Sequence, residues 1–268
     1  MSALPILRRV SFSMCLLALS AASALADPPD DDDDRLLRAK SEAPGEHISR
    51  TGEVGFLRRA AAPGLLQGDI SFGVSTARPG APSAIPDGNL VARLGVGAGL
   101  SVRVSATRNG TSGDYRPGVG VAWQLLGREG GPFSLAVSGD YRPEGFAEPE
   151  GEFEMGVHGT YDKRSYEMSF NVVGGADPEF VEGDVEAAVG GGWRPIPSLI
   201  IGGQARGRFG FGKEAGSTGS SYDELIGAMV AYRLWRLQIT AVGGLAVLTF
   251  NGQTDLGSAV SGELTFGF

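Results

Sequence analysis

The sequence predicts an all-β fold, a transmembrane antiparallel up-and-down β-barrel of about twelve strands, with ten as the alternative count. Of the 268 residues, 42% are hydrophobic, which is too many for a disordered chain, and the 43 Gly follow no collagen-like repeat. After residue 26 no long uncharged apolar run occurs, so no transmembrane helix is expected there. From residue 66 onward apolar and polar residues alternate, which places apolar side chains at every second position, as a membrane barrel requires.

Residues 1–26 predict a cleaved secretory signal peptide. Arg8 and Arg9 precede a short apolar stretch, and Ala-Leu-Ala at residues 24–26 is a small-residue cleavage site. Cleavage removes two of the 23 Lys and Arg, which leaves 21 against 31 Asp and Glu and a net charge of −10. It also removes Cys15, the one cysteine, so disulfide and thiol chemistry are excluded. An acidic exported chain is a poor candidate for binding nucleic acid.

Residues 27–64 predict an acidic, mostly disordered N-terminal segment in the periplasm. Residues 30–34 are five consecutive aspartates, whose mutual repulsion opposes folding. This run is either a solvated tail or a site for calcium or a partner protein, and its role stays open. Residues 55–59, Gly-Phe-Leu-Arg-Arg, form a small apolar and basic patch that we expect to dock near the barrel mouth.

Residues 65–268 predict the barrel itself, through twelve alternating runs. These runs are 66–77, 90–98, 100–108, 118–126, 133–142, 151–161, 165–175, 184–194, 199–209, 222–234, 235–250 and 256–268. Most have the length that a tilted strand needs to cross a bilayer. The longest run, 235–250, contains Gly243 and Gly244, which permit a bend or bulge. The turn before this run should fall between Arg233 and Arg236.

The connections between runs alternate in length. Residues 78–89, 109–117 and 210–221 are long and polar, whereas residues 162–164 and 195–198 are short. Outer-membrane barrels have short turns on the periplasmic side and long loops on the other side. We therefore expect both ends of the barrel domain on the periplasmic side and an even number of strands.

The aromatic residues favour a membrane barrel over a soluble β-sandwich, which would also alternate. Many fall beside the short turns, as an aromatic belt at a membrane interface does. The predicted belt consists of Trp123, Phe133, Tyr161, Tyr166, Trp193, Tyr232, Trp235 and Phe268. In addition, apolar positions in the middle of the runs are often Ala, Val or Gly, which suit contact with lipid better than they fill a soluble core.

The last run ends with Leu264, Phe266 and Phe268 at steps of two. This ending resembles the closing strand of bacterial outer-membrane β-barrel proteins, in which a terminal aromatic residue is recognised during assembly. The resemblance is to an architecture class and to no specific functional family. It implies residence in the bacterial outer membrane, contact with outer-membrane lipids, and help from the barrel-assembly machinery and periplasmic chaperones.

Charged and polar residues occupy the faces of the runs that we predict to point inward. The candidate lining residues are Arg93, Arg103, Asp140, Arg142, Glu152, Glu154, His158, Glu167, Glu186, Gln204, Arg206, Arg208, Arg233 and Glu263. Their order along the chain predicts that a basic sector meets an acidic one. Such a lumen is either a narrow polar pore with opposed fields or a barrel plugged by salt bridges.

The remaining motifs indicate little chemistry. His158 could act as a general base, but the outer-membrane phospholipase family places its Ser–His pair on the lipid-facing side, and here Thr160 takes the position of that serine. Residues 207–213 resemble a phosphate-binding loop but continue with Glu214, and no His and Cys set suggests a metal. We expect no catalytic residue, metal or cofactor.

The sequence thus predicts a narrow pore or transport protein for small polar or amphipathic solutes. The alternatives are a non-conducting structural or surface-contact barrel with a salt-bridged lumen and, third, a membrane-embedded hydrolase. The identity of the solute and the oligomeric state remain open.

Overall fold

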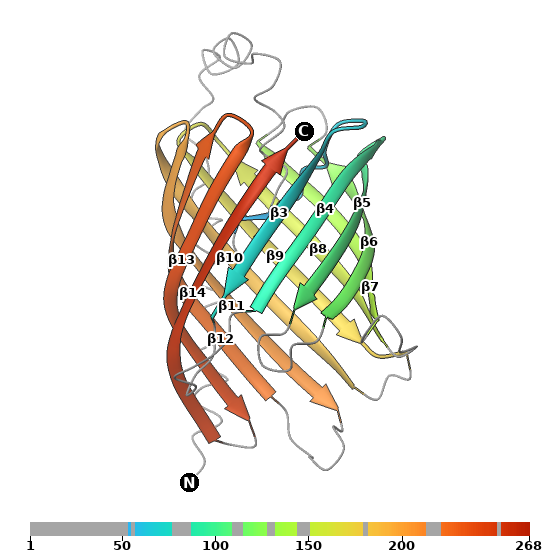
Figure 1. Cartoon of the computed structure of the whole chain (residues 1–268), viewed down its shortest axis with the longest axis vertical. Helices are drawn as coiled ribbons and strands as arrows, with labels where there is room; N and C mark the ends of the chain where they lie inside the picture. Colours follow the sequence, from blue (N-terminus) through green and yellow to red (C-terminus); the bar gives the residue numbers. More distant parts are fainter. Residues whose placement is uncertain are drawn as a thin grey trace. The chain divides into compact units, whose positions relative to one another are not determined.

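The computed structural model contains the predicted twelve-stranded barrel (Figure 1). It describes residues 53–54, 57–76, 87–108, 115–127, 132–143, 151–178, 182–212, 221–250 and 253–268. Within them, no helix has the length and apolar character needed to cross a membrane. The predicted signal peptide and the five aspartates at residues 30–34 lie outside the described residues.

The barrel strands follow one another in chain order. They are β3 (Gly68–Ser75), β4 (Asp87–Gly97), β5 (Leu100–Arg108), β6 (Tyr115–Leu126), β7 (Phe133–Pro143), β8 (Gly151–Asp162), β9 (Tyr166–Ala176), β10 (Glu182–Ile196), β11 (Leu199–Gly212), β12 (Ser221–Leu234), β13 (Leu237–Phe250) and β14 (Gln253–Gly267). Each strand pairs antiparallel with the next, and β14 pairs with β3 to close the sheet. The structure therefore decides between twelve strands and ten.

The short connections, the start of β3 and the end of β14 gather at one rim of the barrel (Figure 1). The turns at residues 98–99, 197–198 and 235–236 lie there, and the last one falls within the predicted interval. Trp235 in this turn has a φ of 54°, and its ring stacks with the Arg236 guanidinium at 5.0 Å. We call this end the short-turn rim.

The strand β13 runs without a bend or bulge at Gly243 and Gly244, although glycines there would permit one. Pairing is continuous through these residues on both sides of β13. Register shifts occur instead between Gly95 and Gly97, between Gln124 and Leu126, and between Trp193 and Ile196, all close to the short-turn rim. The irregular backbone thus lies where the strands end, and the centre of β13 remains regular.

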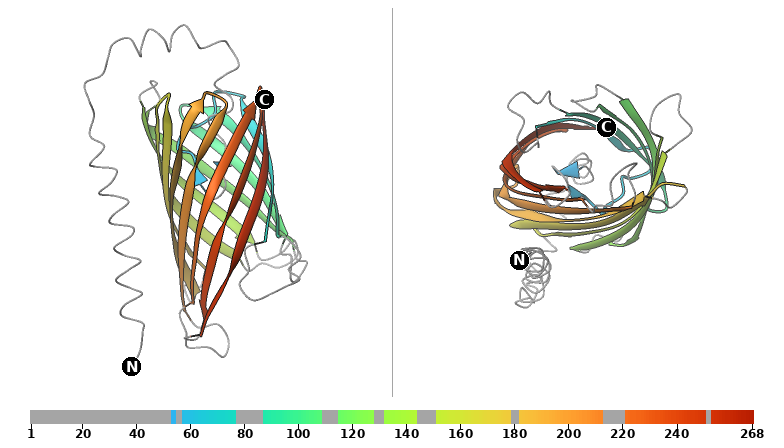
Figure 2. Two further views of the ribbon diagram at one scale, coloured as in Figure 1. Left: turned by 90° about the vertical axis from the view of Figure 1, so that its left-hand side faces the viewer. Right: turned by 90° about the horizontal axis from the view of Figure 1, so that it is seen from below.

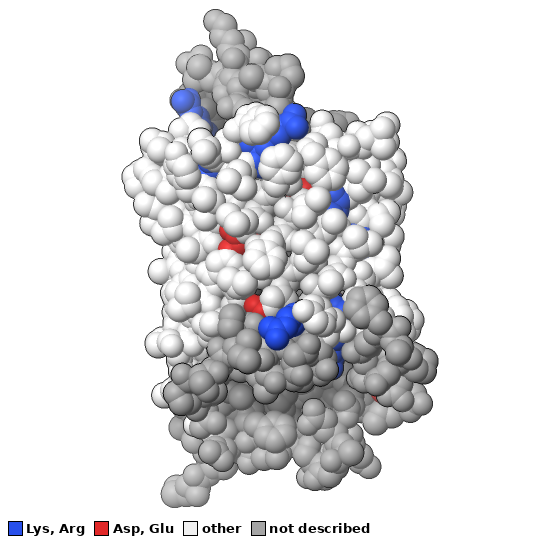
Figure 3. Space-filling model, in the orientation of Figure 1, with Lys and Arg blue, Asp and Glu red and all other residues white. Residues whose placement is uncertain are grey.

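The outer surface of the barrel is apolar, and the face shown in Figure 3 carries few charged side chains. Outward positions expose large apolar residues such as Val121, Met155 and Val230, at 55%, 76% and 45% of their full surface. Most of the predicted belt is also exposed, including Trp193 and Trp235, while Tyr161 and Tyr166 are half-buried and stack at 5.7 Å. A closed sheet with an apolar outside and a polar inside is the reverse of a soluble sandwich.

The last residue completes the closure of the barrel. The Phe268 N–H donates to the Gly68 carbonyl at 2.9 Å, and the Gly68 N–H donates to the Phe268 carbonyl at 3.1 Å. The Phe268 ring covers Gly68, where an added Cβ would lie 2.7 Å from the ring.

We predict that deleting Phe268 prevents assembly of the folded barrel, because it removes both closing hydrogen bonds, at about 1 kcal/mol each, together with the ring contact. Heat-modifiable electrophoretic mobility measures the folded fraction. Phe268→Ala keeps the two backbone hydrogen bonds and should therefore assemble better than the deletion. Full assembly of the deletion variant would contradict this role of the last residue.

Candidate functional site in the barrel lumen

The lumen contains part of the chain itself. Residues 57–64, which we call the luminal segment, lie inside the ring of strands (Figure 2, right). Their first two residues form β2 (Leu57–Arg58), which pairs with β1 (Glu53–Val54). We expected residues 27–64 to be mostly disordered and the basic patch to dock near the mouth. Residues 57–59 of that patch instead extend into the lumen and bind its wall, whereas residues 27–52 lie outside the described residues.

The segment enters the lumen at the short-turn rim, beside the end of β4. The Leu66 N–H donates to the Gly95 carbonyl at 2.9 Å, and the Gly95 N–H donates to the Gln67 carbonyl at 2.8 Å. A Cβ at Gly95 would lie 2.2 Å from the Gly64 oxygen and 2.4 Å from the Pro63 oxygen. Only glycine at position 95 leaves room for the backbone of the segment to pass.

Arg59 forms the most buried ion pair of the segment. Its Nε and Nη2 bind the two Glu167 oxygens at 2.6 and 2.9 Å, and the side chains of Arg59 and Glu167 are 2% and 6% exposed. Arg194 also binds Glu167 and Asp162. A bidentate guanidinium–carboxylate pair fixes orientation as well as distance, so Arg59 anchors the segment to β9.

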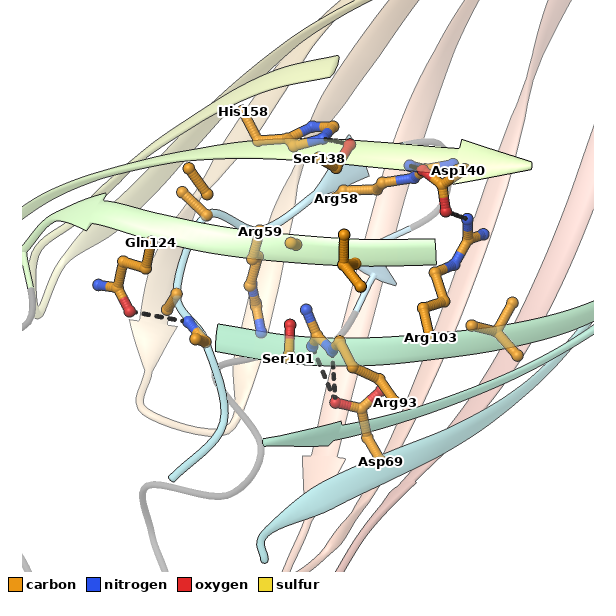
Figure 4. Close-up of a pocket in the computed structure, with 17 residues that line it drawn as sticks. Arg58, Arg59, Asp69, Arg93, Ser101, Arg103, Gln124, Ser138, Asp140 and His158 are labelled. Atoms are coloured by element: carbon orange, nitrogen blue, oxygen red, sulfur yellow. Dashed lines mark hydrogen bonds and ion pairs between the residues drawn. The ribbon is translucent and has the colours of Figure 1, made fainter. Parts of the chain in front are cut away.

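Arg58 binds a second group of carboxylates, on β7 and β8. Its Nη1 lies 2.9 Å from Asp140 Oδ2, and its Nη2 lies 3.8 Å from Glu154 Oε2. The other Asp140 oxygen accepts from Arg103 at 3.1 Å, as Figure 4 shows, and the other Glu154 oxygen is 2.9 Å from Arg142. Each of these two carboxylates is therefore shared between one wall arginine and the segment.

A glycine allows Asp140 to reach Arg103, which lies two strands away. Gly120 of β6 is in register with Arg103 on one side and Asp140 on the other. A Cβ at Gly120 would lie 2.0 Å from Asp140 Oδ1. The absence of a side chain at this inward position thus opens the space in which the ion pair forms.

The wall also hydrogen-bonds the backbone of the segment. The Ala60 N–H donates to Thr160 Oγ1 at 3.0 Å, and the Ala62 N–H donates to Gln124 Oε1 at 2.9 Å. With its amide oriented to satisfy both partners, Asn171 accepts from the Arg58 N–H at 2.7 Å and donates to the Arg58 carbonyl at 2.9 Å. Side-chain groups of β6, β8 and β9 thus bind an extended backbone.

Leu57 contacts the apolar side of the lumen. It is 2% exposed and shares a small pocket with Ile200 and Met229. Gly190 of β10 makes room for it, since a Cβ there would lie 2.8 Å from Leu57 Cδ1. The inward positions of β11–β13 also include buried Ala231 and Val242. The wall is therefore charged on the side of β7–β9 and more apolar on the side of β11–β13.

The cavity left between the segment and strands β3–β8 has a volume of about 40 Å³ (Figure 4). Its lining includes Arg58, Arg93, Arg103, Ser138, Asp140 and His158. One water molecule needs roughly 10–15 Å³ of such volume. The cavity therefore holds only a few water molecules.

Strand alternation places all the predicted lining residues on inward positions. These are Arg93, Arg103, Asp140, Arg142, Glu152, Glu154, His158, Glu167, Glu186, Gln204, Arg206, Arg208, Arg233 and Glu263. The sequence predicts that a basic sector meets an acidic one, and two ion pairs lie where β11 adjoins β10. Arg206 pairs with Glu186 at 4.0 Å, and Arg208 pairs with Asp184, on the neighbouring strand β10. Neighbouring inward side chains lie close enough to pair directly, and the charges are thereby paired along the wall.

Several residues that the site uses are not among the candidates that the sequence predicts. Asp69 binds Arg93 at 2.8 Å, and Arg194 holds Glu167. Both residues stand at inward positions of predicted runs, so their charge in an alternating strand was an available signal. No such local signal marked Arg58 and Arg59 as lining residues, because their partners are 82 and 108 residues away in the chain.

His158 lies in a buried hydrogen-bonded row between Ser138 and Asn171. Its Nε2 is 2.8 Å from Ser138 Oγ, and the Asn171 amide nitrogen is 3.1 Å from its Nδ1. The row joins β7, β8 and β9 and, through Asn171, supports the backbone of the luminal segment.

No group of three or more His, Cys, Asp or Glu side chains with metal-binding geometry occurs among the described residues.

Comparison with known proteins identifies the fold and no family. No family model matches the chain, and no curated protein matches it. Among solved structures it is similar to the KdgM porin, with a TM-score of 0.50, 7% identity and coverage of 75% of this chain and 99% of the other. It is equally similar to the NanC porin, with a TM-score of 0.50, 11% identity and coverage of 75% and 98%. The chain therefore has the closed antiparallel barrel fold of outer-membrane porins.

Proposed function

We propose that the protein is a narrow pore of the bacterial outer membrane for small polar or amphipathic solutes, and that the luminal segment controls passage. The observation that carries the proposal is the lumen itself, a polar and charged channel wall that encloses a short chain segment. Ion pairs and hydrogen bonds hold most of this segment, and Leu57 alone inserts a large apolar side chain into the wall. Such contacts can exchange with water, which makes the segment displaceable.

The charged and apolar sides of the wall favour solutes with both characters. Arginines and carboxylates of β5–β9 can bind polar groups, while Ile200, Met229 and Val242 can contact an apolar part. The apolar outer surface, the aromatic residues at the short-turn rim and the closing Phe268 support insertion in the outer membrane. Export by a cleaved signal peptide and insertion by the barrel-assembly machinery with periplasmic chaperones belong to the same proposal.

Single-channel recording in a planar bilayer tests the pore. We expect discrete conductance steps from the wild-type protein and longer or larger openings from Arg59→Gln, which loses the bidentate pair with Glu167. Arg206→Gln is the matched control, because Arg206 lies on the wall and pairs with Glu186 at 4.0 Å. It removes one wall charge but leaves the pair of Arg59 with Glu167 intact, so it should not lengthen the openings.

The second candidate function is a non-conducting structural or surface-contact barrel. The buried group of Arg59, Glu167 and Arg194 favours it, because such a group also makes a rigid plug. Baseline current from both the wild type and Arg59→Gln, with both proteins folded by heat-modifiable mobility, would overturn the pore and support this candidate.

A further inference from the structure

The luminal segment occupies its place in the way that a bound peptide occupies a groove. The wall contacts the segment in two ways. Wall carboxylates bind the side chains of the two adjacent arginines, and polar wall side chains hydrogen-bond the backbone of the segment. Arg58 points to Asp140 and Glu154, whereas Arg59 points to Glu167. Each guanidinium therefore has a binding site of its own. Neither kind of contact depends on the segment being covalently joined to the barrel.

The carboxylates of this groove are held in position by the wall. Arg103 binds one oxygen of Asp140, Arg142 binds one oxygen of Glu154, and Arg194 binds Glu167. In Asp140 and Glu154 the second oxygen faces Arg58. Because the wall arginines stay when the segment leaves, they keep the carboxylates oriented toward the place of the departed guanidinium groups.

The backbone contacts select an extended peptide rather than a lone cation. Asn171 binds both polar groups of Arg58, and Thr160 and Gln124 accept from Ala60 and Ala62 at alternate residues. Ala60 is itself 2% exposed, so the groove is closely fitted to a small side chain after the two arginines. An acidic or bulky peptide would place repulsive charge or excess volume at these positions.

We propose that the wall around Asp140, Glu154 and Glu167 is a recognition site for an extended peptide with two adjacent arginines, and that residues 57–62 occupy it as an internal copy of this ligand. This inference rests on the proposed function, because the segment must leave the lumen before another peptide can bind there. It names basic peptides as the solutes or effectors that compete with the segment.

The test uses the full chain and a fluorescent peptide with the sequence of residues 57–62, Leu-Arg-Arg-Ala-Ala-Ala. Fluorescence anisotropy measures binding to the folded protein in detergent. The Arg58→Gln, Arg59→Gln double variant should bind the peptide saturably. The wild type should bind it at least about tenfold more weakly, because a tethered segment competes at an effective concentration of roughly millimolar.

Two control peptides separate recognition from general attraction. With both arginines replaced by glutamine, saturable binding should be lost. With both replaced by lysine, binding should weaken about tenfold or more, since lysine cannot make the bidentate contact. Equal binding of the arginine peptide to the wild type and the double variant, or equal binding of the arginine and lysine peptides, would overturn the proposal.

A second variant covers the case in which the double variant fails to fold. Gly95→Ala keeps both arginines and all wall carboxylates but obstructs the entry of the segment, so it should also bind the peptide better than the wild type. Peptide binding without any bilayer conductance would leave the recognition site standing and remove the pore. Bilayer conductance without arginine-dependent peptide binding would support the pore and overturn the recognition site.

Discussion

Replacing Glu167 with glutamine is expected to release the luminal segment. The change leaves two buried guanidinium groups, those of Arg59 and Arg194, without their shared carboxylate. Removing one partner of a buried ion pair destabilises by about 3–5 kcal/mol. Even the lower figure corresponds to roughly a hundredfold rise in the population of the released segment.

Trypsin cleavage after Arg58 or Arg59 measures this release. Cleavage follows the open population when closing is fast, so mass spectrometry of the N-terminal fragments should show cleavage about a hundredfold faster in Glu167→Gln. Glu186→Gln is the matched control, because Glu186 pairs with Arg206 at 4.0 Å and both are more exposed. A pair of this kind contributes about 0–1 kcal/mol. Equal protection of Arg58 and Arg59 in both variants would show that the Glu167 pair does not hold the segment.

Gly95→Ala is expected to displace the luminal segment without changing any charge. The new Cβ would lie 2.2 Å from the Gly64 oxygen and 2.4 Å from the Pro63 oxygen, well inside the closest approach of non-bonded atoms. These neighbours are backbone atoms, so the chain must shift at the point where it enters the lumen. The hydrogen bonds between Gly95 and residues 66 and 67 should weaken with it.

The measurements for Gly95→Ala are bilayer conductance and trypsin cleavage, and both should increase. Gly73→Ala is the matched control, because Gly73 also faces inward, on the neighbouring strand β3, and its nearest atom would lie at 3.7 Å, an ordinary contact. The control should behave as the wild type. Wild-type conductance and protection in Gly95→Ala would contradict the placement of residues 63–64 beside β4.

The predicted runs and the observed strands agree closely because alternation is a local property. Any strand with one face toward lipid and one toward a polar lumen must repeat every two residues, and each run shows this by itself. The same period assigned Arg103, Asp140 and Glu154 to the inward face. The first residues of β4 and β6 were less predictable. Residues 87–89 and 115–117 extend these strands at their start into mainly polar sequence, where the alternation does not mark a strand.

The pairing of the charges required the closed barrel. The period shows that Arg103 and Asp140 face the lumen, but their ion pair depends on strand register and on the absence of a side chain at Gly120 between them. The same holds for the row of Ser138, His158 and Asn171, which joins three strands. A sequence pattern states which face a residue occupies and leaves open which residue stands beside it.

By itself the sequence determined an alternating, closed, lipid-facing barrel and the polar character of its interior, because these follow from a period of two and from the spacing of turns. Only the tertiary structure decided that residues 57–64 lie inside and that Arg58 and Arg59 bind Asp140, Glu154 and Glu167. The physical reason is distance along the chain. These partners are 82 to 108 residues apart, and they meet because barrel closure brings strands from the middle of the sequence around a segment near its start.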